Sequence, residues 1–227
     1  MKSMKSQQSG FTLVEIAIVL VIIGLLLGGI LKGQELINSA KVKNLAQDFK
    51  TVPLYIYGYQ DRYKALPGDD ARVATNVSGA TLATTPAASI GNGVIDGAWN
   101  SVTATDESVL FWQHVRLANF AAGPTTVDVT AAGDYLPKNV EGGRMGLTGN
   151  TTTQAPVTGM TGTYAFCSAG LLGKYAKQLD TTLDDGNTAT GSLRVIDNQT
   201  GAQAAPVAAI ATASVADSSS YTVCMAF

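Results

Sequence analysis

Gly10-Phe11-Thr12-Leu13-Val14-Glu15 heads an apolar run that continues to Leu31. From Phe11 to Leu31 the run has 21 residues and a single charge, that of Glu15. A helix of this length covers about 31 Å, enough to cross the hydrocarbon core of a bilayer, so we predict a membrane-spanning helix. A carboxylate near the start of a lipid-facing helix is costly unless another group pairs with it. We therefore expect the assembled state of the protein to neutralise Glu15.

The helical pattern continues beyond the apolar run as a single apolar stripe. Its members follow one another at alternating steps of three and four residues: Val42, Leu45, Phe49, Val52, Ile56, Tyr59 and Tyr63. This spacing predicts an amphipathic helix continuous with the membrane span. The Leu66-Pro67-Gly68-Asp69 stretch should end it. We expect one helix over residues 11–64, with residues 11–31 in the membrane.

Four glycines lie in or just after the apolar run: Gly24, Gly28, Gly29 and Gly33. Their four-residue spacing is typical of helices that pack closely in lipid. Glycine also weakens a helix, so the same residues would allow the segment to melt or stretch locally. The two interpretations are compatible, and the sequence does not choose between them.

The remaining chain predicts a mixed helix and strand head over residues 65–227. Gly, Thr, Ala and Asn are frequent in residues 67–104, which we interpret as an irregular connection. The patterns then predict a helix, two strands, a short helix and two further strands, at residues 107–120, 127–129, 162–167, 170–182, 192–196 and 220–227. An antiparallel sheet packed on the apolar stripe would keep the stripe out of water, which gives an α+β fold.

Charge and residue chemistry exclude several classes of function. The net charge is −2, and removing a leader of residues 1–10 would leave 13 basic against 17 acidic side chains, a net charge of −4. With no basic stripe outside the first helix, nucleic acid is not an expected partner. The single histidine, His114, lies beside Trp112, which should sit at the margin of its helix, and no G-x-S-x-G motif is present. We therefore interpret His114 as a core or surface residue and expect neither enzymatic activity nor a cofactor.

The two cysteines, Cys167 and Cys224, are far apart and do not have metal-ligand spacing. In an exported chain such a pair indicates one disulfide formed in an oxidising compartment. Two separate buried thiols are the alternative.

Two loops contain the residue types that bind calcium. Asn92 and Asp96 lie in one, and Asp184 and Asp185 lie in the other, but neither loop has the spacing of an EF-hand. Asn, Asp and Gly also suit tight turns, which explains both loops more simply. We predict no metal site and keep calcium at these four residues as the alternative.

The stretch from Gly10 to Glu15, behind a short basic leader and ahead of an apolar span, resembles the processing site of type IV prepilins and type II secretion pseudopilins. The resemblance covers residues 1–64, and the rest is similar to a pilin head only in architecture. It implies a pilin-like fold with a prepilin leader at residues 1–10, a long helix at residues 11–64 and a globular periplasmic or extracellular head at residues 65–227.

The resemblance also implies how the chain is processed. A membrane prepilin peptidase and methyltransferase would cut between Gly10 and Phe11 and then N-methylate Phe11. Glu15 would pair with the Phe11 amino group of a neighbouring subunit in a helical filament, where a low dielectric strengthens the attraction. The implied partners are this peptidase, other pilin subunits and an inner-membrane assembly platform.

The function implied is that of a structural subunit of a type IV pilus-like or type II secretion pseudopilus filament. The alternative is a minor tip pilin whose head is an adhesive or substrate-binding module. The chain would be a single-pass protein of the bacterial inner membrane with a periplasmic head, and then part of a pilus or periplasmic pseudopilus. Many family members carry an early proline in the mature helix, where this chain has Lys32-Gly33.

Overall fold

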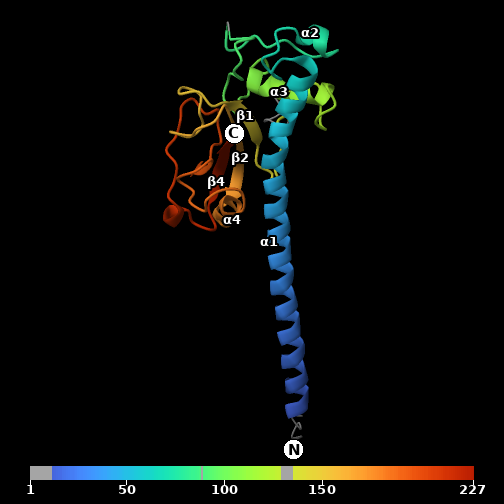
Figure 1. The fold of residues 1–227 in the computed structure, drawn as a ribbon. Coiled ribbons are helices and arrows are strands. Elements are labelled where there is room, and N and C mark those ends of the chain that lie inside the picture. Colours follow the sequence, from blue (N-terminus) through green and yellow to red (C-terminus); the bar gives the residue numbers. More distant parts are fainter. Residues whose placement is uncertain (1–11, 88, 129–134) are drawn as a thin grey trace, which may run out of the picture. The chain divides into compact units, whose positions relative to one another are not determined.

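The computed structural model describes residues 12–87, 89–128 and 135–227 (Figure 1). The chain divides into two compact units, Met1–Ala40 and Lys41–Phe227. Its elements in chain order are α1 (Leu13–Tyr63), α2 (Val73–Asn76), α3 (Glu107–Leu117), β1 (Met145–Gly149), β2 (Tyr164–Leu172), α4 (Gly173–Leu183), β3 (Leu193–Asp197), the 3₁₀ turn η1 (Thr212–Ser214) and β4 (Ser220–Ala226).

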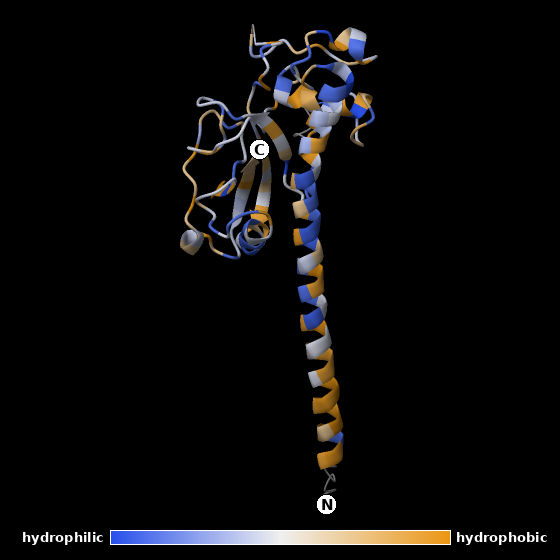
Figure 2. Ribbon diagram, in the orientation of Figure 1, coloured by the Kyte–Doolittle hydropathy of each residue, from blue (hydrophilic) through white to orange (hydrophobic). Residues whose placement is uncertain are grey.

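The predicted long helix is confirmed as α1, a continuous helix of 51 residues. It ends at Tyr63 because Lys64 adopts a left-handed backbone with φ 54°, a common way for a helix to stop. Figure 2 shows the first turns of α1 as almost entirely hydrophobic, whereas the later turns mix the two colours. The change in colour along α1 corresponds to the change in sequence from the apolar run of residues 11–31 to the apolar stripe that begins at Val42.

The second unit is built on a four-stranded antiparallel sheet in the order β1-β2-β4-β3. The predicted disulfide is present: Cys167 of β2 and Cys224 of β4 occupy directly opposite positions in the ladder and are bonded. Both are completely buried. The bond therefore ties the final strand to the central strand at the middle of the sheet.

Alternate residues of the strands face two different hydrophobic clusters. Phe166 and its same-face neighbours join the apolar stripe of α1 in the main core, where the Phe49 and Phe166 rings meet edge to face with centroids 5.0 Å apart. Cys167 and the opposite face join a second cluster with Trp99 and Val157. Because loops cover this second face, the central strand β2 is buried on both sides. The predicted packing of an antiparallel sheet on the striped part of the helix is confirmed.

Strand β1 was not predicted, and the strand expected at residues 127–129 is wrong for its described part. Val127 and Asp128 are not in a strand, and Val129 lies outside the described residues. β1 contains Gly146 and Gly149, which strands disfavour. Gly146 is required there because a Cβ would come within 1.7 Å of the Trp99 carbonyl oxygen.

Helix α3 is shorter and more deeply buried than expected. It ends at Leu117 instead of residue 120, and Trp112, expected at the margin, is only 3% exposed. Irregular segments enclose the helix on several sides: Gln113 accepts a hydrogen bond from the Thr81 N–H and donates one to the Thr125 carbonyl. Because irregular segments cover α3 on several sides, its polar residues are buried along with its apolar ones. The spacing of apolar residues in the sequence therefore does not predict how deeply the helix is buried.

The connection over residues 67–104 is mostly irregular, as expected, but it contains the short helix α2 and is held by specific contacts. Gly68 has φ 92° and lies against α3, where the N–H of Gly68 donates to Nδ1 of His114 at 2.9 Å. The other ring nitrogen of His114 lies 2.9 Å from the Thr81 carbonyl oxygen. His114 is therefore a core residue that joins two turns of the irregular segment.

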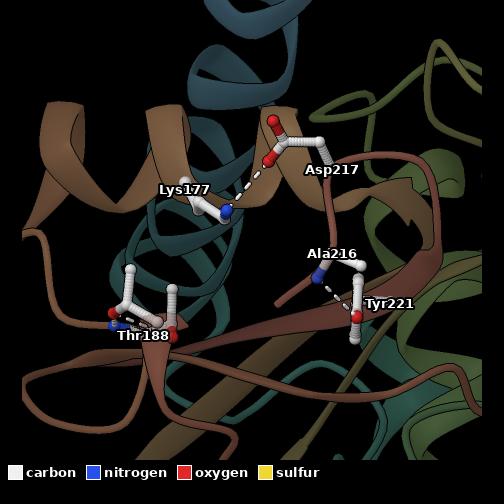
Figure 3. Close-up of polar contacts among 6 residues, drawn as sticks. Lys177, Thr188, Ala216, Asp217 and Tyr221 are labelled. Atoms are coloured by element: carbon white, nitrogen blue, oxygen red, sulfur yellow. Dashed lines mark hydrogen bonds and ion pairs between the residues drawn. The ribbon is translucent and has the colours of Figure 1, made fainter. Parts of the chain in front are cut away.

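Polar contacts close the C-terminal part of the sheet, and Figure 3 shows them from one side. Lys177 of α4 forms an ion pair with Asp217, with Nζ and Oδ1 2.8 Å apart. The Tyr221 hydroxyl accepts a hydrogen bond from the Ala216 N–H at 2.9 Å, and the Thr188 N–H donates to the Thr212 hydroxyl. These contacts fix the segment before β4 to α4 and to the loop before β3.

Replacing Gly68 tests how closely the irregular segment approaches α3. In Gly68→Ala the new Cβ would lie 2.5 Å from the Glu107 carbonyl oxygen, in addition to the strain of positive φ. We expect the free energy of unfolding to fall by about 2–4 kcal/mol, measured by chemical denaturation of the full chain in detergent. Gly79→Ala is the matched control, because Gly79 has φ 81° with open space around it, and it should cost only about 1 kcal/mol. Equal losses in the two variants would contradict the close approach.

Candidate assembly segment

The first turn of α1 contains a reciprocal capping arrangement between Thr12 and Glu15. The Glu15 N–H donates to the Thr12 hydroxyl oxygen at 3.3 Å. In return, Oε2 of Glu15 accepts from the Thr12 N–H at 2.8 Å and from the Thr12 hydroxyl at 2.7 Å. This is a capping box, which satisfies N–H groups that have no partner at a helix start. Within a single chain, Glu15 is therefore hydrogen-bonded by its own helix terminus.

The Thr12-x-x-Glu15 spacing carried this signal, but sequence reasoning considered Glu15 only as a charge that needs a partner. Gly10 and Phe11, the predicted cleavage and methylation positions, lie outside the described residues. Their roles stay predictions.

The apolar run forms an uncovered surface. Every large apolar side chain between Leu13 and Leu31 is at least 46% exposed. By length and composition α1 could cross a membrane. A Cβ added at Gly24, Gly28 or Gly29 would meet no described atom within 4 Å apart from the neighbouring backbone of its own helix. Such a surface is stable only against lipid or against other apolar protein surfaces.

The loop that contains Asn92 and Asp96, two of the residues of the calcium alternative, is held by the chain's own hydrogen bonds. Asp69 accepts from the N–H groups of Gly91, Asn92 and Gly93. Asn92 donates to Oδ2 of Asp96 at 2.7 Å and accepts from the Val94 N–H, which is an Asx turn. The structure thus gives these two residues a role in the turn, and sequence reasoning did not identify Asp69 as its anchor.

The second loop brings Asp184 and Asp185 together with Asp180 of α4. One oxygen of each lies within 4.8 Å of the others, which is close enough to surround an ion. These carboxylates also accept hydrogen bonds from their own loop: Asp184 from the Leu193 N–H and Asp185 from the Asn187 N–H, both at 2.8 Å. Calcium binding at these residues stays the alternative to the prediction of no metal site.

Glu107 is a buried acid that sequence reasoning placed only at a helix start. It is 1% exposed and accepts hydrogen bonds from the Ser89 hydroxyl and the Asp96 N–H, each at 2.8 Å. Burial raises its pKa to about 7, and the nearby charges of Asp69 and Asp96 act in the same direction. Its partners come from the irregular segment, so no local pattern identifies it.

The raised pKa of Glu107 predicts a pH-dependent contribution to stability. As the pH rises from 4.5 towards 7, the unfolded chain releases this proton before the folded chain does, so stability falls, by up to about 3 kcal/mol. In Glu107→Gln this part of the decline should disappear, while the declines from Asp48 and Asp180, each with a pKa raised to about 6, remain. Unfolding titrations between pH 4 and 8 measure the slope. Glu35→Gln, at an exposed acid, is the control, and a slope unchanged by Glu107→Gln would contradict the assignment.

Comparison with known proteins gives one match. Residues 5–31 match the family model described as the prokaryotic N-terminal methylation motif. No curated protein and no solved structure matches the chain. The matched segment contains the second half of the predicted leader, the predicted cleavage site, the capping box and the apolar run to Leu31. The motif implies processing by a prepilin peptidase and assembly with other pilin subunits, and it fits a membrane-anchored chain before assembly. Residues 5–31 are therefore a prepilin segment of the type IV pilin and pseudopilin kind, which supports a type IV pilin-like or pseudopilin protein and suggests a structural subunit rather than an enzyme.

Proposed function

We propose that this protein is a structural subunit of a type IV pilus-like or type II secretion pseudopilus filament and polymerises through α1. The observation that carries the proposal is the exposed apolar surface of residues 13–31 within a prepilin segment. A membrane can cover this surface before assembly, and the same surface of neighbouring subunits can cover it afterwards. Association would then replace lipid contacts with protein contacts without exposing apolar side chains to water.

Glu15 gives the polymer its register. Cleavage between Gly10 and Phe11 would create a free amino group four residues before Glu15. In the apolar interior of a filament, a carboxylate and an ammonium group attract strongly, and either one alone is penalised. The capping box holds Glu15 at the helix start in the single subunit. In the filament, the Glu15 carboxylate would also form an ion pair with the Phe11 amino group of a neighbouring subunit. This pair would fix how far one subunit is displaced along the next.

The prepilin peptidase would recognise and remove the leader of residues 1–10, and it would also methylate Phe11. Residues 11–31 would cross the inner membrane, and the head would lie in the periplasm beside an assembly platform. The disulfide between Cys167 and Cys224 suits that compartment, since disulfides persist where conditions are oxidising.

Substitutions at Glu15 and Thr12 separate the intersubunit role of the carboxylate from its capping role. Glu15→Gln keeps a capping box but removes the charge, whereas Thr12→Val removes the capping hydroxyl and keeps the charge. If the ionic pair directs assembly, Glu15→Gln should reduce filament incorporation at least about tenfold, as should Glu15→Ala, because an unpaired buried ammonium group is left in the filament. Thr12→Val should assemble at close to the wild-type level. The measurement is the ratio of sheared filament protein to membrane protein.

All variants must first be inserted and processed, which the mass of the membrane-bound form reports. Normal incorporation of Glu15→Gln would refute the ionic role. Loss of incorporation in Thr12→Val together with normal incorporation of Glu15→Gln would assign Glu15 to capping alone.

Leader removal has its own test at Gly10. A bulky residue, as in Gly10→Leu, should block cleavage, because the peptidase acts on the bond that follows this glycine. Gly10→Ala should be cleaved at a normal or reduced rate. Intact-mass spectrometry distinguishes the precursor from the mature chain by the mass of residues 1–10 and detects the added methyl group on Phe11. Complete processing of Gly10→Leu would exclude cleavage at this position.

A further inference from the structure

A cavity of about 180 Å³ lies between α1 and α3 in the second unit. A single water needs about 10–15 Å³ of such space, so the cavity has room for one small organic molecule or for several waters. Its walls combine two opposite charges with apolar side chains. They comprise Asp48, Thr51, Val52 and Tyr55 of α1, Trp112 and Arg116 of α3, and Ala121, Ala122, Pro137, Met145 and Phe166.

The α3 side of the cavity presents unused hydrogen-bond donors. Trp112 and Arg116 lie one helical turn apart and are 3% and 6% exposed. Nε1 of Trp112 and Nε of Arg116 are buried and have no hydrogen-bond partner among the residues that the structure describes. Buried N–H groups almost always have one, because leaving such a group unpaired costs about 1–3 kcal/mol.

Arg116 is also a buried cation. Its Nη1 donates to the carbonyl oxygens of Pro124 and Tyr135, each at 3.0 Å. Its guanidinium carbon lies 4.8 Å from the centre of the Tyr135 ring and 5.8 Å from that of Trp112. These contacts hold the side chain in place, and none of them is an ion pair with a carboxylate of residues 12–87, 89–128 or 135–227.

The α1 side presents an unused acceptor. Asp48 is partly buried, and it forms no hydrogen bond or ion pair with the described residues; burial raises its pKa to about 6. Tyr55 of the same helix also lines the cavity. Burial raises the pKa of its hydroxyl, the charge of Asp48 adds to this rise, and the charge of Arg116 opposes it. The acid and the cation therefore face a shared space without contacting each other.

The wall between the charges is apolar. Val52, Met145 and Phe166 are each less than 9% exposed. Burying an unpaired charge beside an apolar wall costs free energy. A single molecule that contacts both Asp48 and Arg116 would reduce this cost for both side chains. Because Asp48 and Arg116 cancel, an occupant with no net charge leaves the cavity neutral. A single anion or a single cation would not.

We propose that this cavity binds a small zwitterion, and that its ligand class is a free α-amino acid with an aliphatic side chain. The α-carboxylate accepts hydrogen bonds from Nε1 of Trp112 and Nε of Arg116. The α-ammonium group donates to the Asp48 carboxylate, and the aliphatic group contacts Val52, Met145 and Phe166. The proposal does not depend on filament assembly, since every residue of the site lies in the second unit.

Calorimetric titration of the full chain in detergent micelles tests the ligand class. L-Leucine is the probe, and 4-methylpentanoate and isopentylamine are the same molecule without the amine and without the carboxylate. We expect L-leucine to bind at least about tenfold more tightly than either, because each lacks one charge-assisted hydrogen bond. No binding of L-leucine at millimolar concentration would mean that the cavity holds water only and would overturn the proposal. Equal binding of 4-methylpentanoate or isopentylamine would also overturn it.

Two variants and one control test the residues. Asp48→Asn should weaken L-leucine binding by about tenfold or more, since it removes the charge that meets the ammonium group. Trp112→Phe should weaken it by about fivefold, because the ring remains and only the N–H is lost. Asp61→Asn replaces an exposed acid on the same helix and should leave the affinity unchanged. Melting curves establish that each variant is folded. Unchanged affinity in both folded cavity variants would exclude this site.

Discussion

The packing of the α1 stripe on the sheet is the interaction on which the second unit depends. One helical face supplies Leu45, Phe49, Val52 and Ile56, each at most 3% exposed, to the core that the sheet completes. Fully burying a side chain of this size stabilises a fold by about 1.5–3 kcal/mol. Helices α3 and α4, of 11 residues each, also contact the strands. Without α1, the strand residues that meet its stripe would be exposed to water.

The same helix is suited to two different surroundings along its length. Its first part is apolar on every side, as a helix in lipid or in a bundle must be. Its second part is apolar along one stripe only, as a helix on a sheet must be. Glu15 breaks this rule in the first part, and the capping box with Thr12 explains how one chain tolerates it. The charge lies at the one position of an apolar helix where backbone N–H groups need an acceptor.

The features that could be predicted from the sequence are those that depend on the residue types and spacing within one segment. The long helix, three of the four strands and the disulfide follow from periodicity, spacing and composition, and the prepilin segment follows from the family resemblance of residues 10–15. Strand β1 was missed because Gly146 and Gly149 serve the close approach of distant backbone and carry no strand signal. The full burial of α3 was missed because irregular segments, not another regular element, cover it. Of the assembly site, the charge of Glu15 was identified, whereas its bonds to Thr12 were overlooked although the spacing contained them.

Several buried acids of the second unit differ from the partly buried Asp48 in how their carboxylates are satisfied. Asp70 accepts hydrogen bonds from the Tyr59 hydroxyl, the Arg72 N–H and the Asn76 side chain. Asp69 and Glu107 are likewise satisfied by nearby turns. In these cases the acid organises an irregular segment, and its burial is offset by the bonds it accepts. Asp48 accepts no hydrogen bond from the described residues and lies on a regular helix that needs no such organiser. Nε of Arg116, across the same space, also has no hydrogen-bond partner among the described residues, and the proposed ligand would supply a partner to each of the two side chains.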